Sequence, residues 1–352
     1  MRTDHDPRCE VIVGVDTHAD QHTAVAINGI GQVQDTIEVP TTTAGFDQLV
    51  SWARALGQFE RAGVEGCGAY GAGLARHLAD VGVTVLEVDR PNRQRRRRRG
   101  KSDPTDAENA ARAVLAGEAT TVPKVSTGQV EAVRILHLTR RSAVKAQVQA
   151  GNQIKDLVLT APASIRNQLR DLTTKQRVKL CAAWRPGPVT DPTSANRRAM
   201  RDLARRWLDL AAEIKELEAD LLRLLRELVP SVLAERGAGI DVAAKLVIAA
   251  GENPERLKNE ASFAALCGSS PVDASSGKHA AHRLNRGGNR QANNALYTVA
   301  IHRTRTCDET KAYIERRRAE GKTDRAIRRC LKRTLARRFH RLLVHDLTSG
   351  LT

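Results

Sequence analysis

The stretch Glu10-Val11-Ile12-Val13-Gly14-Val15-Asp16 is a short apolar run, rich in β-branched residues, that ends in an acid. A run of this kind predicts a strand buried in the middle of a sheet. The acid at its end is costly to bury unless a cation or another polar group pairs with it. Asp16 is therefore the first candidate functional residue.

The residues that follow predict the rest of the sheet. Residues 23–27 form a second β-branched run, and Asn28-Gly29 after it is typical of a hairpin turn. Further on we expect a strand at 32–39, an amphipathic helix at 43–56, a strand end at 63–66, a helix at 74–81 and a strand at 83–88. Three meandering strands followed by alternating helices and strands resemble the ribonuclease H-like, or RuvC-like, α/β fold, a mixed sheet with flanking helices.

Two further places in this region offer isolated acids. Glu65 lies at a strand end, and Asp103 and Asp106 lie in Lys101-Ser102-Asp103-Pro104-Thr105-Asp106-Ala107. Structural roles also explain them: Glu65 could sit in a solvated turn, and Asp103 is a good N-cap with Asp106 at the third helical position. Carboxylates brought together repel one another unless a divalent cation neutralises them, and magnesium prefers oxygen ligands. The ordered set of four acids therefore predicts a Mg²⁺ site suited to phosphoryl transfer.

The charge of the chain points to a polyanionic partner. The net charge is +17 and the pI is near 10.2, which fits DNA or RNA. Aromatic residues make up only 3%, which argues against base-stacking platforms for single strands. Basic residues directly before the acidic pair predict phosphate contact, namely Arg95, Arg96, Arg97, Arg98, Arg99 and Lys101.

No apolar run is long enough to span a bilayer, and the polar start MRTDHDPRCE is not a signal peptide, so we expect no membrane partner. The six scattered cysteines contain no C-x-x-C pair and suggest neither disulfides nor zinc. A reducing cytoplasm is the simplest compartment.

The middle of the chain predicts long helices. Residues 129–159 form one, and a second carries the three-four spacing of a coiled-coil seam at Met200, Leu203, Trp207, Leu210, Ile214, Leu217, Leu221, Leu224 and Leu228. The partner of this seam is the earlier long helix, the same helix of another subunit, or both. An ordinary buried helix in a bundle is the alternative.

The last third is predicted to be mainly α-helical and carries a second polar segment. Gly237 to Ala250 resembles a helix-hairpin-helix, although a plain helix turn explains it almost as well. The polar segment runs from Leu266 through Ser275-Ser276-Gly277-Lys278, and Arg283, Arg286 and Arg290 follow it. Residues 324–347 predict a basic amphipathic helix, for which nucleic-acid contact or a solvated face are the two readings.

Taken together, these motifs resemble the DEDD transposases of bacterial insertion sequences, the group named after insertion sequence one-hundred-ten. The resemblance rests on Gly14-Val15-Asp16-Thr17-His18, on Val64-Glu65-Gly66 and the 101–107 segment, and on a glycine and proline followed by Ser276-Gly277. It implies that Asp16, Glu65, Asp103 and Asp106 bind the metal and that Ser276 is the DNA nucleophile. Without it, Ser275, Ser269 and Ser270 would be equally good candidates. The usual leucine after Gly268 is absent.

The charges of Lys278, Arg283, Arg286 and Arg290 beside the serine predict contact with nucleic acid. The resemblance also implies guidance by a structured non-coding RNA and a serine–DNA linkage in strand exchange. We expect a RuvC-like metal-binding domain at 8–122, a helical coiled-coil region at 123–232 that forms a homo-oligomer, and a transposase domain with a basic tail helix at 233–352. The rivals to a transposase are a RuvC-like junction resolvase without serine chemistry and a non-catalytic nucleic-acid-binding protein.

Overall fold

The computed structural model describes residues 9–88, 102–124, 127–253, 257–273, 282–283 and 285–349. The chain divides into two compact units, Met1–Thr127 with Gly251–Arg256 and Gly128–Ala250 with Leu257–Thr352. Each unit has its own apolar core. The division into three domains expected from the sequence stays a prediction.

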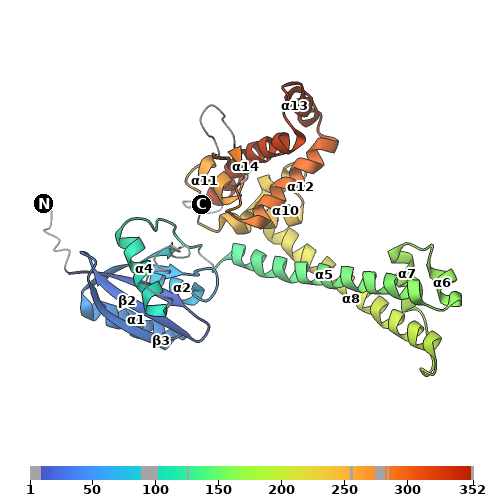
Figure 1. Cartoon of the computed structure of the whole chain (residues 1–352), viewed down its shortest axis with the longest axis horizontal. Helices are drawn as coiled ribbons and strands as arrows, with labels where there is room; N and C mark the ends of the chain where they lie inside the picture. The colour runs from blue at the N-terminus through green and yellow to red at the C-terminus, as the bar shows by residue number, and fades with distance from the viewer. Residues whose placement is uncertain are drawn as a thin grey trace. The chain divides into compact units, whose positions relative to one another are not determined.

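A five-stranded mixed sheet forms the centre of the first unit (Figure 1). Its order is β3-β2-β1-β4-β5, in which the first three strands are an antiparallel meander and the last two run parallel to β1. The strands are β1 (Glu10–Thr17), β2 (Gln21–Asn28), β3 (Val33–Pro40), β4 (Gln58–Glu65) and β5 (Thr84–Val88). β1 lies in the middle and is buried from Val11 to Thr17, as its apolar run predicts.

Helices cover both faces of this sheet. α1 (Thr43–Leu56) and α2 (Ala72–Asp80) pack on the face that carries Val13, Val15 and Val64. α4 (Asp103–Leu115) packs on the opposite face, against Ile12 and its neighbours. Neighbouring residues of β1 alternate between two apolar cores, which explains why β1 has no polar side chain from Val11 to Val15. The mixed sheet with flanking helices confirms the α/β fold class expected for this region.

Two glycines let α4 lie directly on the sheet. A Cβ atom on Gly14 of β1 would lie 2.0 Å from the carbonyl oxygen of Ala107 and 2.3 Å from the amide nitrogen of Ala111. A Cβ on Gly63 of β4 would lie 2.7 Å from the carbonyl oxygen of Ala110. The backbones of helix and strands therefore touch at these positions, and any larger residue must push α4 away.

Replacing Gly14 by alanine is expected to destabilise the first unit by about 1–3 kcal/mol, because the added methyl group overlaps backbone atoms that cannot rotate away. Urea denaturation followed by circular dichroism measures the change. Gly68→Ala is the matched control, since a Cβ there meets nothing within 4 Å. Equal unfolding midpoints for the two variants would contradict the close packing of α4.

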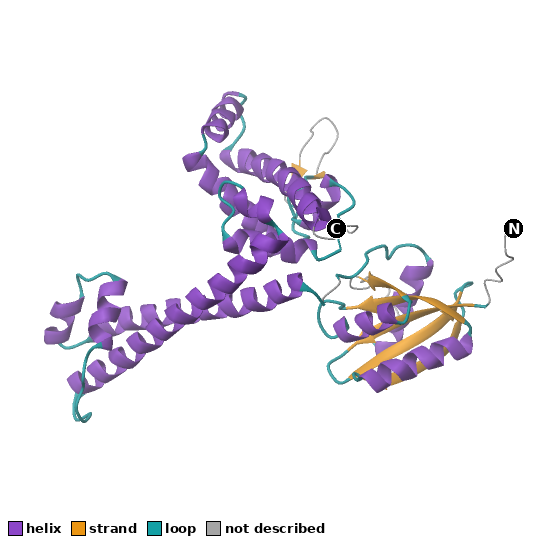
Figure 2. Ribbon diagram, turned by 180° about the vertical axis from the view of Figure 1, so that it is seen from behind, coloured by secondary structure: helices purple, strands orange, loops and turns teal. Residues whose placement is uncertain are grey.

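The second unit begins with two long antiparallel helices, α5 (Gln129–Thr160) and α8 (Pro192–Leu228), joined through α6 (Ala163–Leu169) and α7 (Thr174–Ala182). α5 and α8 lie side by side along much of their length (Figure 2). Arg140 Nε lies 2.9 Å from Glu218 Oε1, and Gln147 Nε2 donates to the Trp207 carbonyl at 3.4 Å.

The earlier long helix, α5, is therefore a partner of the predicted seam. The ends of that seam are buried at Met200, Leu221 and Leu224, whereas Leu210, Ile214 and Leu217 between them are half-buried. The coiled coil and its contact with another subunit stay predictions.

The remainder of the second unit is mainly helical. It contains α9 (Pro230–Ala234), α10 (Ile240–Ala250), α11 (Glu260–Leu266), α12 (Arg290–Thr306), α13 (Asp308–Ala319) and α14 (Asp324–Ser349), with a two-stranded ribbon of β6 (Val272–Asp273) and β7 (His282–Arg283). α9 and α10 are joined by a turn with Gly237 at φ 88°, and its description as a helix-hairpin-helix stays a prediction. No helix in the described ranges combines the length and apolarity that crossing a membrane requires.

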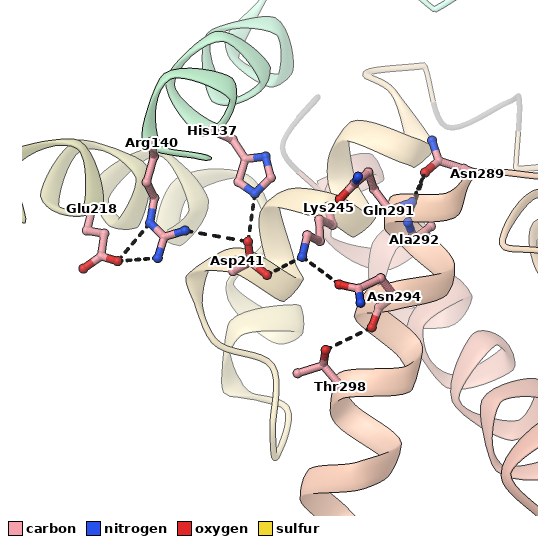
Figure 3. A network of polar contacts seen from close by, with 10 residues as sticks. All are labelled: His137, Arg140, Glu218, Asp241, Lys245, Asn289, Gln291, Ala292, Asn294 and Thr298. Atoms are coloured by element: carbon pink, nitrogen blue, oxygen red, sulfur yellow. Dashed lines mark hydrogen bonds and ion pairs between the residues drawn. The ribbon is translucent and has the colours of Figure 1, made fainter. Parts of the chain in front are cut away.

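A polar network joins α5, α8, α10 and α12 within this unit (Figure 3). Asp241 lies at its centre, with Oδ1 3.0 Å from His137 Nε2 and Oδ2 2.5 Å from Lys245 Nζ. Lys245 also donates to Asn294 Oδ1 at 2.9 Å. Burial by itself would raise the pKa of Asp241, but the hydrogen bonds from His137 and Lys245 and their charges hold it well below its usual range. The network therefore connects α5 and α8 with α10 and α12.

Candidate functional site

Two of the predicted acids lie at the ends of neighbouring parallel strands. Asp16 is the second-last residue of β1 and Glu65 is the last of β4, and the residues just before them, Val15 and Val64, pair across the sheet. Both valines point into the core on the α1–α2 face. Because side chains alternate along a strand, Asp16 and Glu65 fall on the opposite face, which α4 covers.

The hydroxyl of Thr17 fixes the end of β4 next to β1. Its Oγ1 donates to the Glu65 carbonyl oxygen at 2.8 Å. Gly66 follows with φ 70°, so the chain turns sharply away from the sheet directly after the acid. The backbone that carries Glu65 is thus held against the backbone that carries Asp16.

α4 supplies the other two acids from its first turn. The contacts of its backbone with Gly14 and Gly63 hold its N-terminal end near the ends of β1 and β4. Asp106 is buried, whereas the Asp103 side chain is half exposed. Acids in the first turn also favour the helix dipole.

The predicted N-cap role of Asp103 is wrong by one residue. Ser102 has the extended backbone of an N-cap, with φ −145° and ψ 148°, and α4 begins at Asp103. The Ser102 hydroxyl contacts Thr105 Oγ1 at 2.8 Å instead of capping the helix. The Asp103 carboxylate is therefore not used as a cap, and its Oδ2 atom lies 3.4 Å from His18 Nε2.

The imidazole of His18 contacts the carboxylates of both Asp16 and Asp103. Its Nε2 atom lies 3.4 Å from Asp16 Oδ2 as well as from Asp103 Oδ2. One ligand atom from each of these three residues lies within 4.8 Å of the others, a spacing that one metal ion can bridge. Half of the His18 side chain is exposed, so the site is open to solvent.

The surroundings of Asp16 disfavour the ionised form of its carboxyl group. Burial raises the pKa of this carboxyl, His18 partly offsets the rise, and the carboxylates of Asp103 and Asp106 raise it further. Among the described residues, the positive charge of His18 offsets these effects on the ionised carboxylate only in part. A cation placed among these oxygens would supply more positive charge.

The structure brings the predicted acids to one end of one face of the sheet. Asp106 is close enough to Asp16 to act on its charge, and Glu65 occupies the adjacent strand end on the same face. The predicted basic residues before the acidic pair lie outside the described residues, namely Arg95, Arg96, Arg97, Arg98, Arg99 and Lys101.

The second predicted site lies in the other unit, where two segments of chain are held together at its base. β6 pairs with β7 through Val272 with Arg283 and Asp273 with His282. The Asn289 amide donates to the Leu266 carbonyl at 2.6 Å. Gly268 has φ 59°, and a Cβ on it would lie 2.8 Å from the Gly287 carbonyl oxygen, so only glycine fits between the segments. Ser276 and Lys278 themselves lie outside the described residues.

The predicted arginines of this site are exposed. Arg283 lies in β7, Arg286 follows it, and Arg290 is the first residue of α12. Asn289 caps that helix, because its Oδ1 accepts from the amides of Gln291 and Ala292 at 2.9 and 3.0 Å (Figure 3). All three arginines are therefore accessible to a ligand.

Two residues near the sites, His18 and Asn293, were not predicted to have a role there from the sequence. His18 lies two residues after Asp16, and its place in Asp16-Thr17-His18 was the available signal. Asn293 donates through Nδ2 to the carbonyls of Cys267 and Gly268 at 2.8 and 3.0 Å, and accepts from Lys332 Nζ at 2.8 Å. Asn293 carries no local signal, because its contacts come from distant segments, and Lys332 was predicted only as one of the basic residues of the 324–347 helix.

Two family models match this chain, one over each region that carries a predicted site. The family model DEDD_Tnp_IS110, described as "Transposase", matches residues 13–161, which include the four acids. A second model, described as "Transposase IS116/IS110/IS902 family", matches residues 232–315, which include Ser276. A search of curated proteins gave no match. The two family matches do not overlap and together cover more than half of the chain.

Proposed function

Because the chain belongs to the IS110-type DEDD transposases, we propose that it cleaves and exchanges DNA strands with a metal-binding acidic tetrad and a serine nucleophile. The observation that carries this proposal is the cluster of Asp16, His18 and Asp103, with Asp106 acting on Asp16 and Glu65 on the adjacent strand. Sequence-distant acids converge where α4 meets the strand ends, and an acid that serves only as a helix cap would not need this arrangement.

The donor set of the cluster suits a hard divalent cation. Four carboxylates supply oxygen ligands, as Mg²⁺ and Mn²⁺ require, and His18 adds a nitrogen that Mn²⁺ accepts more readily. Asp16, Glu65, Asp103 and Asp106 would hold the ion, with His18 beside them. When bound, the ion activates the attacking oxygen and stabilises the leaving oxygen of a phosphodiester.

The serine step conserves the energy of the broken bond. Ser276 Oγ forms a bond to phosphorus as the bond from phosphorus to one sugar oxygen breaks, and the hydroxyl proton passes to a base while the sugar oxygen gains a proton. A second strand end then displaces the serine. Lys278, Arg283, Arg286 and Arg290, together with the 95–99 arginines and Lys101, would contact the charged backbone. The support is the family match and the exposure of Arg283, Arg286 and Arg290, which follow the Ser276 segment in the chain.

We further propose two partners for this reaction. A structured RNA encoded by the element would choose the DNA sites, and a net charge of +17 suits a protein that holds both nucleic acids. A homo-oligomer would form through the α8 seam. The half-buried Leu210, Ile214 and Leu217 leave apolar surface there for a second copy to cover.

Binding of Mn²⁺ tests the metal site without requiring activity. Isothermal titration calorimetry is expected to show binding to the wild type and a loss of affinity of at least about tenfold in Asp16→Asn. His18→Ala is expected to lose roughly tenfold, the effect of removing a neighbour that orients or joins the ligand set. His345→Ala serves as the control, because that imidazole is exposed and lies in the second unit. Equal Mn²⁺ affinity in wild type and Asp16→Asn would reject the metal site.

A further inference from the structure

A basic cavity lies between α14 and the two chain segments that flank residues 274–281. Its volume is about 380 Å³, and its walls include Ser270, Pro271 and Arg283 as well as the start and middle of α14. Six cationic side chains line it: Arg283, Lys322, Arg329, Lys332, Arg333 and Arg337. Among the described residues that form its walls, there is no aspartate or glutamate. The positive charge of this cavity is thus not balanced from within its own walls.

Lys332 is the unusual member of this set because it is buried. Its residue is only 8% exposed, and its Nζ atom donates to the neutral amide oxygen of Asn293 at 2.8 Å. Burial lowers the pKa of this amine, and Cys267 only partly offsets that effect. A buried cation without a carboxylate beside it is costly, and a bound anion would remove that cost.

Other arginines of α14 already have acidic partners outside the cavity. Arg338 pairs with the buried Glu235, and Arg341 Nε lies 3.3 Å from Glu260 Oε1. In contrast, Arg333 contacts a hydroxyl, with Nη1 3.3 Å from Ser270 Oγ. Arg337 is intermediate, since its Nε is 3.8 Å from Glu260 Oε2. Lys332 and Arg333 therefore line the cavity, and their hydrogen bonds to an amide and a hydroxyl group are contacts with neutral groups.

The spacing of these cations indicates the class of ligand. Arg329 and Arg337 are separated by about 12 Å along the helix, at about 1.5 Å per residue. A single phosphate cannot reach both, whereas a nucleic-acid strand carries a phosphate about every 3.4 Å along the duplex axis. The chemistry of the cavity therefore fits several consecutive phosphates of one strand.

We propose that this cavity binds the phosphodiester backbone of DNA, with Lys332 as the buried contact to a phosphate. The proposal rests on the proposed transposase function and places the DNA strand beside the segment that carries Ser276. Asn293 links the two, because its Oδ1 accepts from Lys332 while its Nδ2 donates to the Cys267 and Gly268 carbonyls. Lys332 is a positioning residue. A phosphate bound to Lys332 would be connected, through the hydrogen bonds of Asn293, to the backbone at Cys267 and Gly268.

The test is the salt dependence of binding of the full chain to a short fluorescent DNA duplex. Lys332→Gln is expected to weaken binding about tenfold and to lower the slope of log Kd against log salt by about 1, the value for one lost phosphate contact. Arg329→Gln, an exposed position that cannot unfold the helix, is expected to lower the slope similarly. Arg341→Gln is the matched control, because that arginine pairs with Glu260 and lies outside the cavity.

Unchanged slopes in both Lys332→Gln and Arg329→Gln would overturn the proposal. A hairpin RNA measured in parallel identifies the source of the phosphates: loss of RNA binding with unchanged DNA binding would also overturn it. The proposed function is tested independently, by the effect of Asp16→Asn in the first unit on metal-dependent cleavage. If Asp16→Asn abolishes cleavage while the slopes stay unchanged, the function stands and the cavity proposal falls. If the slopes fall but the wild type shows no metal-dependent cleavage, the cavity proposal stands and the function falls.

Discussion

Asp16→Asn is expected to lower metal-dependent cleavage of DNA by roughly 100-fold or more, because it removes a charged ligand from the group that stabilises the transition state. Glu65→Gln and Asp106→Asn are expected to have effects of the same size. The measurement is the rate of strand cleavage on DNA that carries the ends of the element, with Mg²⁺ and with Mn²⁺. Full Mg²⁺-dependent activity in Asp16→Asn would reject the metal site.

The same substitution is expected to leave the fold intact without metal. Burial and the neighbouring acids raise the pKa of Asp16, so a neutral asparagine removes a charge that is already unfavourable there. The thermal midpoint of the apo protein is therefore expected to be unchanged or higher in Asp16→Asn. Asp20→Asn is the control, because it removes an equal charge from an exposed acid on the nearby turn. A lower midpoint in Asp16→Asn would mean that its loss of cleavage reflects unfolding.

Replacing Asp103 is expected to lower DNA cleavage more than its position at the start of a predicted helix suggests. As an N-cap it would tolerate asparagine, which caps nearly as well. Ser102 holds the cap position, however, and the Asp103 carboxylate lies 3.4 Å from His18. We therefore expect Asp103→Asn to lower cleavage as well, while α4 loses at most about 1 kcal/mol from the removal of one acid in its first turn.

Ser276→Ala is expected to abolish the covalent protein–DNA adduct and to reduce strand exchange roughly 10³-fold or more, because the methyl group of alanine cannot attack phosphorus. A nicked or mispaired substrate that cannot be rejoined is expected to trap the wild-type protein on DNA. This adduct is expected to resist denaturant, and it is counted after gel electrophoresis. Binding of DNA is expected to persist in Ser276→Ala, since the acids and arginines that position the phosphates remain.

Ser275→Ala is the matched control for the nucleophile. It alters the adjacent serine, which does not directly precede Gly277, and is expected to keep the adduct. An adduct that survives Ser276→Ala but disappears in Ser275→Ala would place the nucleophile one residue earlier. No adduct in the wild type, with cleavage still dependent on Asp16 and Glu65, would favour a hydrolytic resolvase of the RuvC type.

Local sequence patterns predicted most of the secondary structure of this chain. The continuous apolar run Val11–Val15 predicted a buried strand, and its residues do lie in two apolar cores, one on each face of the sheet. The spacing from Met200 to Leu228 predicted a helix with one apolar face. These patterns can be read from the sequence because the direction of the side chains repeats along a strand or helix, so that buried positions are apolar at a regular spacing. The cap of α4 was misplaced by one residue, since Ser102 and Asp103 both suit an N-cap and only the backbone angles distinguish them.

By itself, the sequence determined the mixed sheet, the long helices, the ordered acids and the family to which they belong. Tertiary structure alone decided which of these features meet. α4 lies close enough to place Asp103 beside His18 because Gly14 and Gly63 have no side chains, and the choice of α5 as partner for the α8 seam depends on how the chain returns through α6 and α7. The burial of Lys332 likewise depends on the segments that pack around it. A periodic pattern encodes that a face is buried, whereas the surface that buries it is set by contacts between distant segments, which no local pattern records.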